Sequence, residues 1–134
     1  MSNLLNSLLG EKTDLMIEKV VEDVRGKNTF LSFEDLELIL VETNKGFSRG
    51  GHYHKSNTNH TLISGSIHLI QKSILNGYES EKTFVAPATI PISANYAHML
   101  TAITDTKLIE AFPNGYEDTV YPEYRELVER RMKK

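Results

Sequence analysis

Short apolar segments separated by turn-forming residues recur along most of this chain of 134 residues. Leu36, Leu38 and Leu40 alternate with other residues, and this period of two is that of a β-strand. Asn76 and Gly77 predict a two-residue type I′ turn, because both tolerate a positive φ. Strands are expected at 36–42, 61–63, 67–70, 83–85, 98–100 and 108–112. Many short strands without alternating long helices indicate an all-β antiparallel sandwich or barrel.

The two ends of the chain show helical patterns instead. The N-terminal pattern rests on leucines at helical spacing before a glycine: Leu4, Leu5, Leu8, Leu9 and Gly10. Residues 14–24 fit a helix or a strand equally well. Pro122 suits the first turn of a C-terminal helix with an acidic start and a basic end. We therefore predict a single domain over 1–134, with a barrel core at about 28–112, a helical or strand extension over 1–27 and a helix at about 122–134.

Composition narrows the function classes. The formal net charge of −3 gives no reason to expect a nucleic-acid surface. The absence of cysteine excludes disulfides, thiolate metal sites and a cysteine nucleophile, and it fits a cytoplasmic protein. No apolar run approaches the roughly 20 residues that span a bilayer, so we expect no membrane segment. The first residues lack a basic leader and a long apolar centre, which argues against a signal peptide.

The segment around His52 and His54 carries the strongest functional signal. Two imidazoles stand two residues apart after a pair of glycines, and residues at this spacing on an extended strand face the same side. His60 follows on the next predicted strand, and His98 lies in a distant apolar segment. Imidazole is a common metal ligand and the usual acid/base group near neutral pH. The cluster therefore indicates a site.

These residues resemble the first motif of the cupin family. That motif consists of a glycine, five residues, His-x-His, three or four residues, a glutamate, six residues and a glycine. Gly46, His52, His54 and Gly65 match it, whereas Thr58 stands where the family has its glutamate ligand. The resemblance implies a single-domain, antiparallel β-barrel of the jelly-roll type.

The second cupin motif is matched in part. Pro91 and His98 keep its proline and histidine, but the glycine between them is replaced. The resemblance covers about residues 28–112, and it implies a homodimer for which the N-terminal leucines offer an apolar surface.

The metal interpretation follows from this resemblance. Thr58 and His60 have the same strand parity, so an imidazole at 60 could replace the missing carboxylate. The predicted ligands are His52, His54, His60 and His98. An all-nitrogen set suits a divalent transition metal such as zinc, nickel, iron or manganese, with its identity open.

The run Arg49-Gly50-x-His52-x-His54-Lys55 also resembles cupins that isomerise or epimerise nucleotide-linked keto-sugars. In that group the paired histidines are implied acid/base residues. His52 or His54 would then be the base and Tyr96 or Tyr53 a donor, with Arg49 and Lys55 holding a diphosphate. Two alternatives stay open: a metal-dependent cupin of other chemistry, such as a dioxygenase, and a binding module without turnover.

Two further polar residues are ambiguous. Glu110 lies in the apolar run Leu108-Ile109-Glu110-Ala111-Phe112 and either supports a site histidine or faces water, with the second slightly favoured. His68 lies on a predicted strand with uncertain facing, and a packed or hydrogen-bonded residue is the favoured interpretation.

Overall fold

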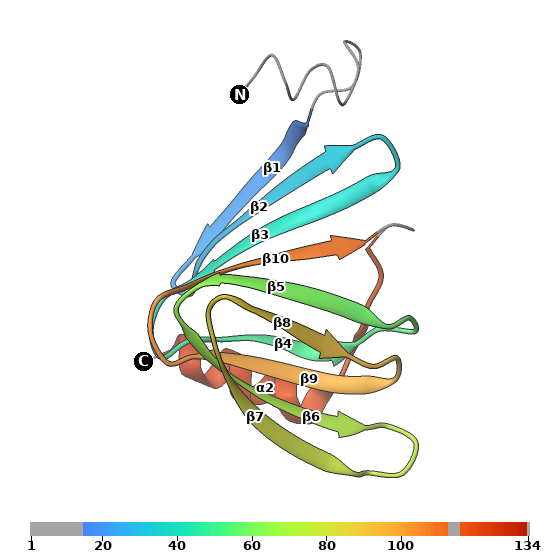
Figure 1. Cartoon of the computed structure of the whole chain (residues 1–134). Coiled ribbons are helices and arrows are strands. Elements are labelled where there is room, and N and C mark those ends of the chain that lie inside the picture. Colours follow the sequence, from blue (N-terminus) through green and yellow to red (C-terminus); the bar gives the residue numbers. More distant parts are fainter. Residues whose placement is uncertain (1–14, 113–115, 134) are drawn as a thin grey trace.

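The computed structural model describes residues 15–112 and 116–133, and strands make up most of this part of the chain (Figure 1). The strands are β1 (Met16–Asp23), β2 (Gly26–Phe33), β3 (Leu36–Thr43), β4 (Ser48–Tyr53), β5 (Thr58–Ser64), β6 (Ser66–Ser73), β7 (Glu79–Val85), β8 (Ala88–Ile92), β9 (Tyr96–Ala102), β10 (Thr106–Phe112) and β11 (Thr119–Val120). The helix α2 (Pro122–Met132) follows them. The predicted all-β class with a C-terminal helix is confirmed.

The strands form two antiparallel sheets that lie above one another in Figure 1. The upper sheet has the strand order β1-β2-β3-β10-β5-β8, and the lower sheet has the order β11-β4-β9-β6-β7. Strands that are neighbours in a sheet are often distant in sequence, as β3 and β10 are. This long-range pairing places β4, β5, β9 and β10 around one interior. These four strands carry most of the polar residues discussed below.

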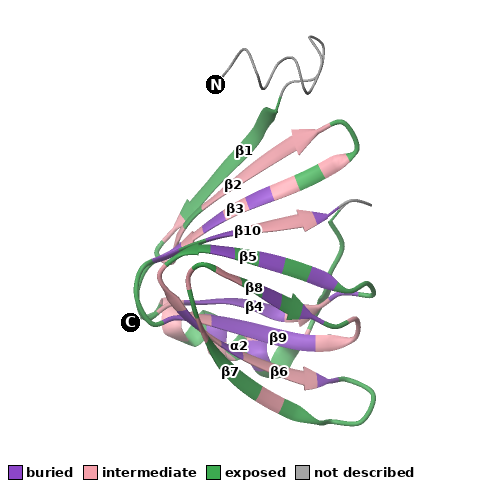
Figure 2. Cartoon of the chain, viewed as in Figure 1, coloured by how far each residue is buried: buried purple, intermediate pink, exposed green. Residues whose placement is uncertain are grey.

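Alternation along the central strands separates an inner from an outer face. On β5, Thr58, His60 and Leu62 are buried while Asn59 and Thr61 are exposed, as the predicted shared parity of Thr58 and His60 requires. The apolar core between the sheets consists of Ile39, Val41, Leu62, Ile67, Leu69, Ile90, Ile92, Leu100, Leu108 and Phe112. Figure 2 shows the burial concentrated on the central strands, whereas β1 is largely exposed.

The strand β3 has apolar residues on both of its faces. Leu36, Leu38 and Leu40 share one face as predicted, but they are half-buried. Ile39 and Val41 on the opposite face are buried in the core. Because both faces are apolar, alternation alone cannot indicate which face of this strand is inside.

The predicted hairpin at Asn76-Gly77 joins β6 and β7, but its predicted turn type is wrong. Among the two central residues only Gly77 has a positive φ, of 77°. Asn76 instead accepts a hydrogen bond with its side chain from the Tyr78 N–H at 2.8 Å. The Ser73 hydroxyl accepts from the Leu75 N–H at 3.2 Å, so side chains stabilise a longer turn over residues 74–77.

The structure settles whether residues 14–24 form a helix or a strand. Most of the segment 14–24 is the strand β1, which pairs antiparallel with β2. The helix predicted around Leu4, Leu5, Leu8 and Leu9 lies outside the described residues. In the described part of the chain, no helix has the length and apolar character needed to cross a membrane.

The helix α2 packs on the outer face of the lower sheet. Ala97 and Met99 of β9 contact Tyr124 and Val128 of α2 in a second apolar cluster. His98 lies between those two residues on β9 and therefore points to the opposite face, into the interior. The helix thus covers the outer face of the strand that carries this histidine.

Candidate metal centre

His52, His54 and His98 come together in the interior although two segments of the chain supply them. Each offers one ring nitrogen, and these three atoms lie within 4.8 Å of one another. The ring centroids of His52 and His98 are 4.7 Å apart, and those of His52 and His54 are 4.9 Å apart. His52 on β4 is the direct partner of His98 on β9, so the pairing register sets this proximity.

A β-bulge just before His52 sets the direction in which the His52 side chain points. The register of β4 against β9 shifts between Gly50 and His52, and both Gly50 and Gly51 have positive φ values, of 102° and 81°. A Cβ on Gly50 would lie 2.6 Å from the carbonyl oxygen of His98, and one on Gly51 would lie 2.6 Å from the Cα of Arg125. These two positions therefore require glycine, which explains the glycine pair before His52.

The Nδ1 atom of each clustered histidine faces an acceptor. His54 Nδ1 lies 2.5 Å from the carbonyl oxygen of Glu117, and His98 Nδ1 lies 3.4 Å from that of Tyr96. His52 Nδ1 lies 3.4 Å from a carboxylate oxygen of Asp118. An imidazole that donates from Nδ1 has its lone pair on Nε2. The three rings thus present Nε2 as their free ligand atom, as metal-binding histidines with outer partners do.

The surroundings of His52 and His98 keep these two imidazoles neutral. Burial, followed by the neighbouring His54, lowers the pKa of His52 to about 4. Burial and the nearby imidazoles also lower the pKa of His98 well below its usual value. A neutral imidazole is the form that binds a metal. At neutral pH these two rings are therefore ready ligands.

A cavity of about 200 Å³, which we call the chamber, adjoins the histidine cluster. Polar and charged groups form much of its wall, together with an apolar part from the core. It is lined by Arg25, Asn28, Phe30, Ile39, Val41, Arg49, Gly50, His52, His98, Leu100, Glu110, Tyr116, Asp118 and Arg125. A space of this kind suits a small polar ligand in contact with the histidines.

Glu110 points into the chamber, so its interpretation as an outward-facing charge is wrong. Its side chain is 15% exposed, and its Oε1 lies 3.6 Å from Nδ1 of His60. Burial raises the pKa of Glu110 to about 7, against the opposing effects of His54 and Arg49. The inward parity of β10, on which Thr106, Leu108 and Phe112 are buried, explains why this carboxyl is inside.

His60 is fully buried behind the cluster and is not one of its three members. Its ring centroid lies 6.0 Å from that of His98. Burial lowers the pKa of His60 to about 3. Its role as a fourth ligand stays a prediction, and its near neighbour is the Glu110 carboxyl.

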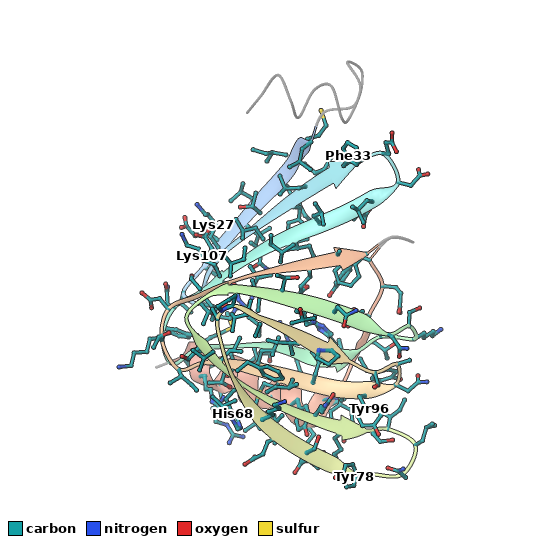
Figure 3. All side chains as sticks on the ribbon, viewed as in Figure 1. Lys27, Phe33, His68, Tyr78, Tyr96 and Lys107 are labelled. Atoms are coloured by element: carbon teal, nitrogen blue, oxygen red, sulfur yellow. The ribbon has the colours of Figure 1, made fainter. Side chains whose placement is uncertain are left out.

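Other residues predicted for the site lie in different surroundings. Arg49 lines the chamber, but Lys55 and Tyr96 are not among its lining residues. Lys55 is exposed, and Tyr53 packs beside the apolar cluster under α2. His68 is half-buried on β6, with its Nε2 3.7 Å from Glu81. Figure 3 labels His68 and Tyr96 toward opposite ends of the lower sheet.

Sequence reasoning missed several chamber residues. Tyr116 and Asp118 lie between β10 and α2, and the Tyr116 hydroxyl donates to Asp118. Arg25 comes from the turn between β1 and β2, and Arg125 from α2. The fold brings these segments to the histidines from far along the chain, and no local spacing marks them.

The comparisons with known proteins concern the fold. No family model and no curated protein matches the sequence. Oxalate decarboxylase from Bacillus subtilis, a protein with Mn(II) centres, aligns over 87% of this chain and 35% of its own, with 16% identity and a TM-score of 0.69. A second structure of oxalate decarboxylase, from work on its substrate binding mode, aligns over the same shares of both chains, with 17% identity and a TM-score of 0.70. CapF, in a crystal structure with the inhibitor 3-isopropenyl-tropolone, aligns over 73% of this chain and 29% of its own, with 18% identity and a TM-score of 0.58.

Both kinds of neighbour are cupin-fold proteins. The chain has the cupin jelly-roll fold. It spans about a third of the length of the solved structures that it matches. The cupin motif histidines are the residues that cluster here, while Thr58, at the position of the cupin glutamate, is buried with its hydroxyl unpartnered within the described structure.

Proposed function

We propose that this cupin is a divalent-metal-dependent isomerase or epimerase that moves a proton on a small keto-sugar. One observation carries the proposal. One ring nitrogen from each of His52, His54 and His98 lies within 4.8 Å of the others, beside a chamber that is also lined by the buried carboxyl of Glu110. A metal-binding group and a proton-transfer group in one cavity are what proton abstraction next to a carbonyl requires.

The three histidines fit a metal on their own geometry. Their Nδ1 atoms have acceptors, and Nε2 of His54 is buried without a partner in the described residues. Three protein ligands leave coordination positions open for a substrate, as in catalytic sites. A divalent metal there would polarise the carbonyl oxygen of the substrate as a Lewis acid. The Mn(II) centres of oxalate decarboxylase, a protein of the same fold, support a divalent metal, and nitrogen ligands also suit zinc, nickel or iron.

Glu110 is the residue best placed to move the proton. A carboxyl with a pKa of about 7 exists in both forms near neutral pH, so it can accept a proton from carbon and return it. The predicted donor Tyr96 is not among the chamber residues, whereas Glu110 is. In this proposal His52 and His54 bind the metal, and Glu110 takes over the acid/base role that the sequence suggested for them.

A second cavity supports a nucleotide-linked form of the sugar. It measures about 420 Å³ and shares Phe30, Ile39 and Tyr116 with the wall of the chamber. The chamber would hold the sugar and the second cavity the nucleotide, against two aromatic side chains that suit a base.

We also propose that the protein acts as a homodimer. Ile17, Val20 and Val21 of β1 expose 67%, 53% and 45% of their surface. An apolar edge strand of this kind is suited to cover by a second copy of the chain. The molar mass in solution, measured by light scattering, tests this part separately.

The decisive experiment combines metal content with carbon-bound proton exchange. The untagged protein should contain about one divalent metal per chain by elemental mass spectrometry. His54→Ala should lose it, while His68→Ala, a matched change outside the cluster, should keep it. In D₂O, NMR should show deuterium entering the carbon next to the carbonyl of a nucleotide-linked 4-keto-sugar, and Glu110→Gln should stop this while keeping its metal.

Other outcomes would replace the proposal. Metal-loaded protein that releases CO₂ from oxalate but exchanges no sugar protons would show the alternative metal chemistry. Metal-loaded protein that binds the sugar without exchange would be a binding module. Protein that takes up none of zinc, nickel, iron or manganese would contradict the metal centre.

A further inference from the structure

Arg49 is a buried cation that forms no ion pair with any described residue. Arg49 is 7% exposed. Within residues 15–112 and 116–133, no carboxylate oxygen lies within 4.0 Å of its guanidinium nitrogens. Its Nε donates to the Thr43 hydroxyl at 3.1 Å, and one terminal nitrogen donates to the Glu42 carbonyl at 2.9 Å. A guanidinium has five N–H donors, so most of them are left for a ligand.

Burial and the neighbouring Arg25 make the charge of Arg49 costly. Burial, followed by repulsion from Arg25, lowers the pKa of Arg49 to about 10 against the attraction of Asp23 and Glu110, so it stays charged at neutral pH. Arg25 lines the same chamber, with its own charge held by Asp23 at 2.7 Å. A buried charge is costly unless it is paired. An anion bound between these arginines would provide the missing partner.

A third polar group faces the same space. Asn28 on β2 lines the chamber, and its Oδ1 is buried with no partner among the described atoms. A half-turn of the amide exchanges its oxygen and nitrogen and would present two N–H donors. Two guanidinium groups and an amide form a donor set suited to the oxygens of a carboxylate or a phosphate.

We propose that Arg49, Arg25 and Asn28 form an oxyanion subsite within the chamber, so that the substrate carries a carboxylate or phosphate away from its metal-binding end. This inference rests on the proposed function for the reaction but not for the binding of the anion. The bulge leaves Arg49 and His52 on the same face, opposite Leu100 and His98 on β9. Those two positions are roughly 7 Å apart along a strand. The substrate must therefore have oxygen ligands at one end and an anionic group several atoms away.

Calorimetry with simple anions tests the subsite on the protein as purified. We expect inorganic phosphate or malonate to bind, and the stronger of the two identifies the subsite as one for phosphate or for carboxylate. Arg49→Met should weaken this binding by about 10- to 100-fold, as expected for the loss of charge-assisted hydrogen bonds. Arg130→Met is the matched control, since Arg130 is an exposed residue of α2 paired with Glu126, and it should bind as the wild type does.

Two additional variants separate this inference from the metal proposal. His54→Ala should lose the metal but keep phosphate or malonate binding. Arg25→Met should weaken anion binding with metal content unchanged, and it serves in place of Arg49→Met if that variant does not fold. The subsite is refuted if neither anion binds the wild type, if both arginine variants bind as the wild type does, or if binding disappears with the metal in His54→Ala.

Discussion

Arg49 and His52 line the same chamber although they are three residues apart on one strand. On a regular strand this spacing places two side chains on opposite faces. The bulge at Gly50 and Gly51 adds one residue to β4, so that Arg49 pairs with Leu100 while His52 pairs with His98. The glycine pair thus places Arg49 and His52 on the same face, beside one chamber.

Substitution of Gly51 should therefore damage both stability and the site. Gly51→Ala meets a positive φ of 81° and the Cα of Arg125 at 2.6 Å, so backbone must shift. Gly77→Ala is the control, because Gly77 has a similar φ of 77° but open space around it. We expect a loss of about 1–2 kcal/mol for Gly77→Ala from conformation alone, and a larger loss for Gly51→Ala. Urea unfolding measures both, and equal losses would show that the contact with Arg125 is unimportant.

Asp118 should contribute to metal affinity without being a ligand. Its carboxylate lies 3.4 Å from His52 Nδ1 and fixes the ring that presents Nε2 to the cluster. Asp118→Asn removes the charge, and the loss of such an outer partner typically weakens metal binding about 10- to 100-fold. Competition with a chelator measures this affinity. Asp35→Asn, in an exposed turn, is the matched control, and identical affinities in the two variants would exclude the supporting role.

His60→Leu distinguishes a three-histidine centre from the four-histidine centre that the sequence suggested. His60 lies outside the group whose ligand atoms are within 4.8 Å of one another. Leucine fills much of the same buried volume, so the fold should persist. We expect unchanged metal content by elemental mass spectrometry. Loss of the metal in a folded variant would restore His60 as a ligand.

The sequence predicted the fold well because its signals were local. The His-x-His pair, the hairpin at Asn76-Gly77 and the C-terminal helix each depend on neighbouring residues. The contributions of Arg25 and Asp118 were missed, since they depend on which distant segments the sheets bring together. Lys55 is exposed and is not among the residues that line the chamber, so its role in holding a diphosphate stays a prediction.

Acid should destabilise the protein through its buried imidazoles. The pKa of His60 is about 3 in the folded protein, below the usual 6.5, so the unfolded chain binds a proton first. The stabilisation is present above pH 6.5 and is lost as the pH falls toward 3. The buried ring should contribute a slope of about 1.4 kcal/mol per pH unit in this range. With metal removed, the free energy of unfolding between pH 6.5 and 5 should fall less steeply in His60→Leu than in the wild type, and parallel curves would contradict the shift.

Glu110 should change stability in the opposite sense, over a range of pH that overlaps that of His60. Its pKa of about 7 in the folded protein lies above the ordinary 4.5, so the folded state keeps a proton that the unfolded chain has released. The free energy of unfolding therefore falls as the pH rises from 4.5 to 7, and the full cost of the buried charge is present above pH 7. This cost is on the order of 3 to 3.5 kcal/mol.

Glu110→Gln isolates this contribution because glutamine keeps the shape and cannot ionise. With metal removed from both proteins, the variant should gain stability relative to the wild type between pH 5 and pH 8, by about 2–3 kcal/mol. Glu81→Gln, on the exposed strand β7, should show no such gain. A constant difference between Glu110→Gln and the wild type across this range would mean that Glu110 is ionised throughout, and a carboxylate fixed in that form could not return the proton that the proposed reaction requires.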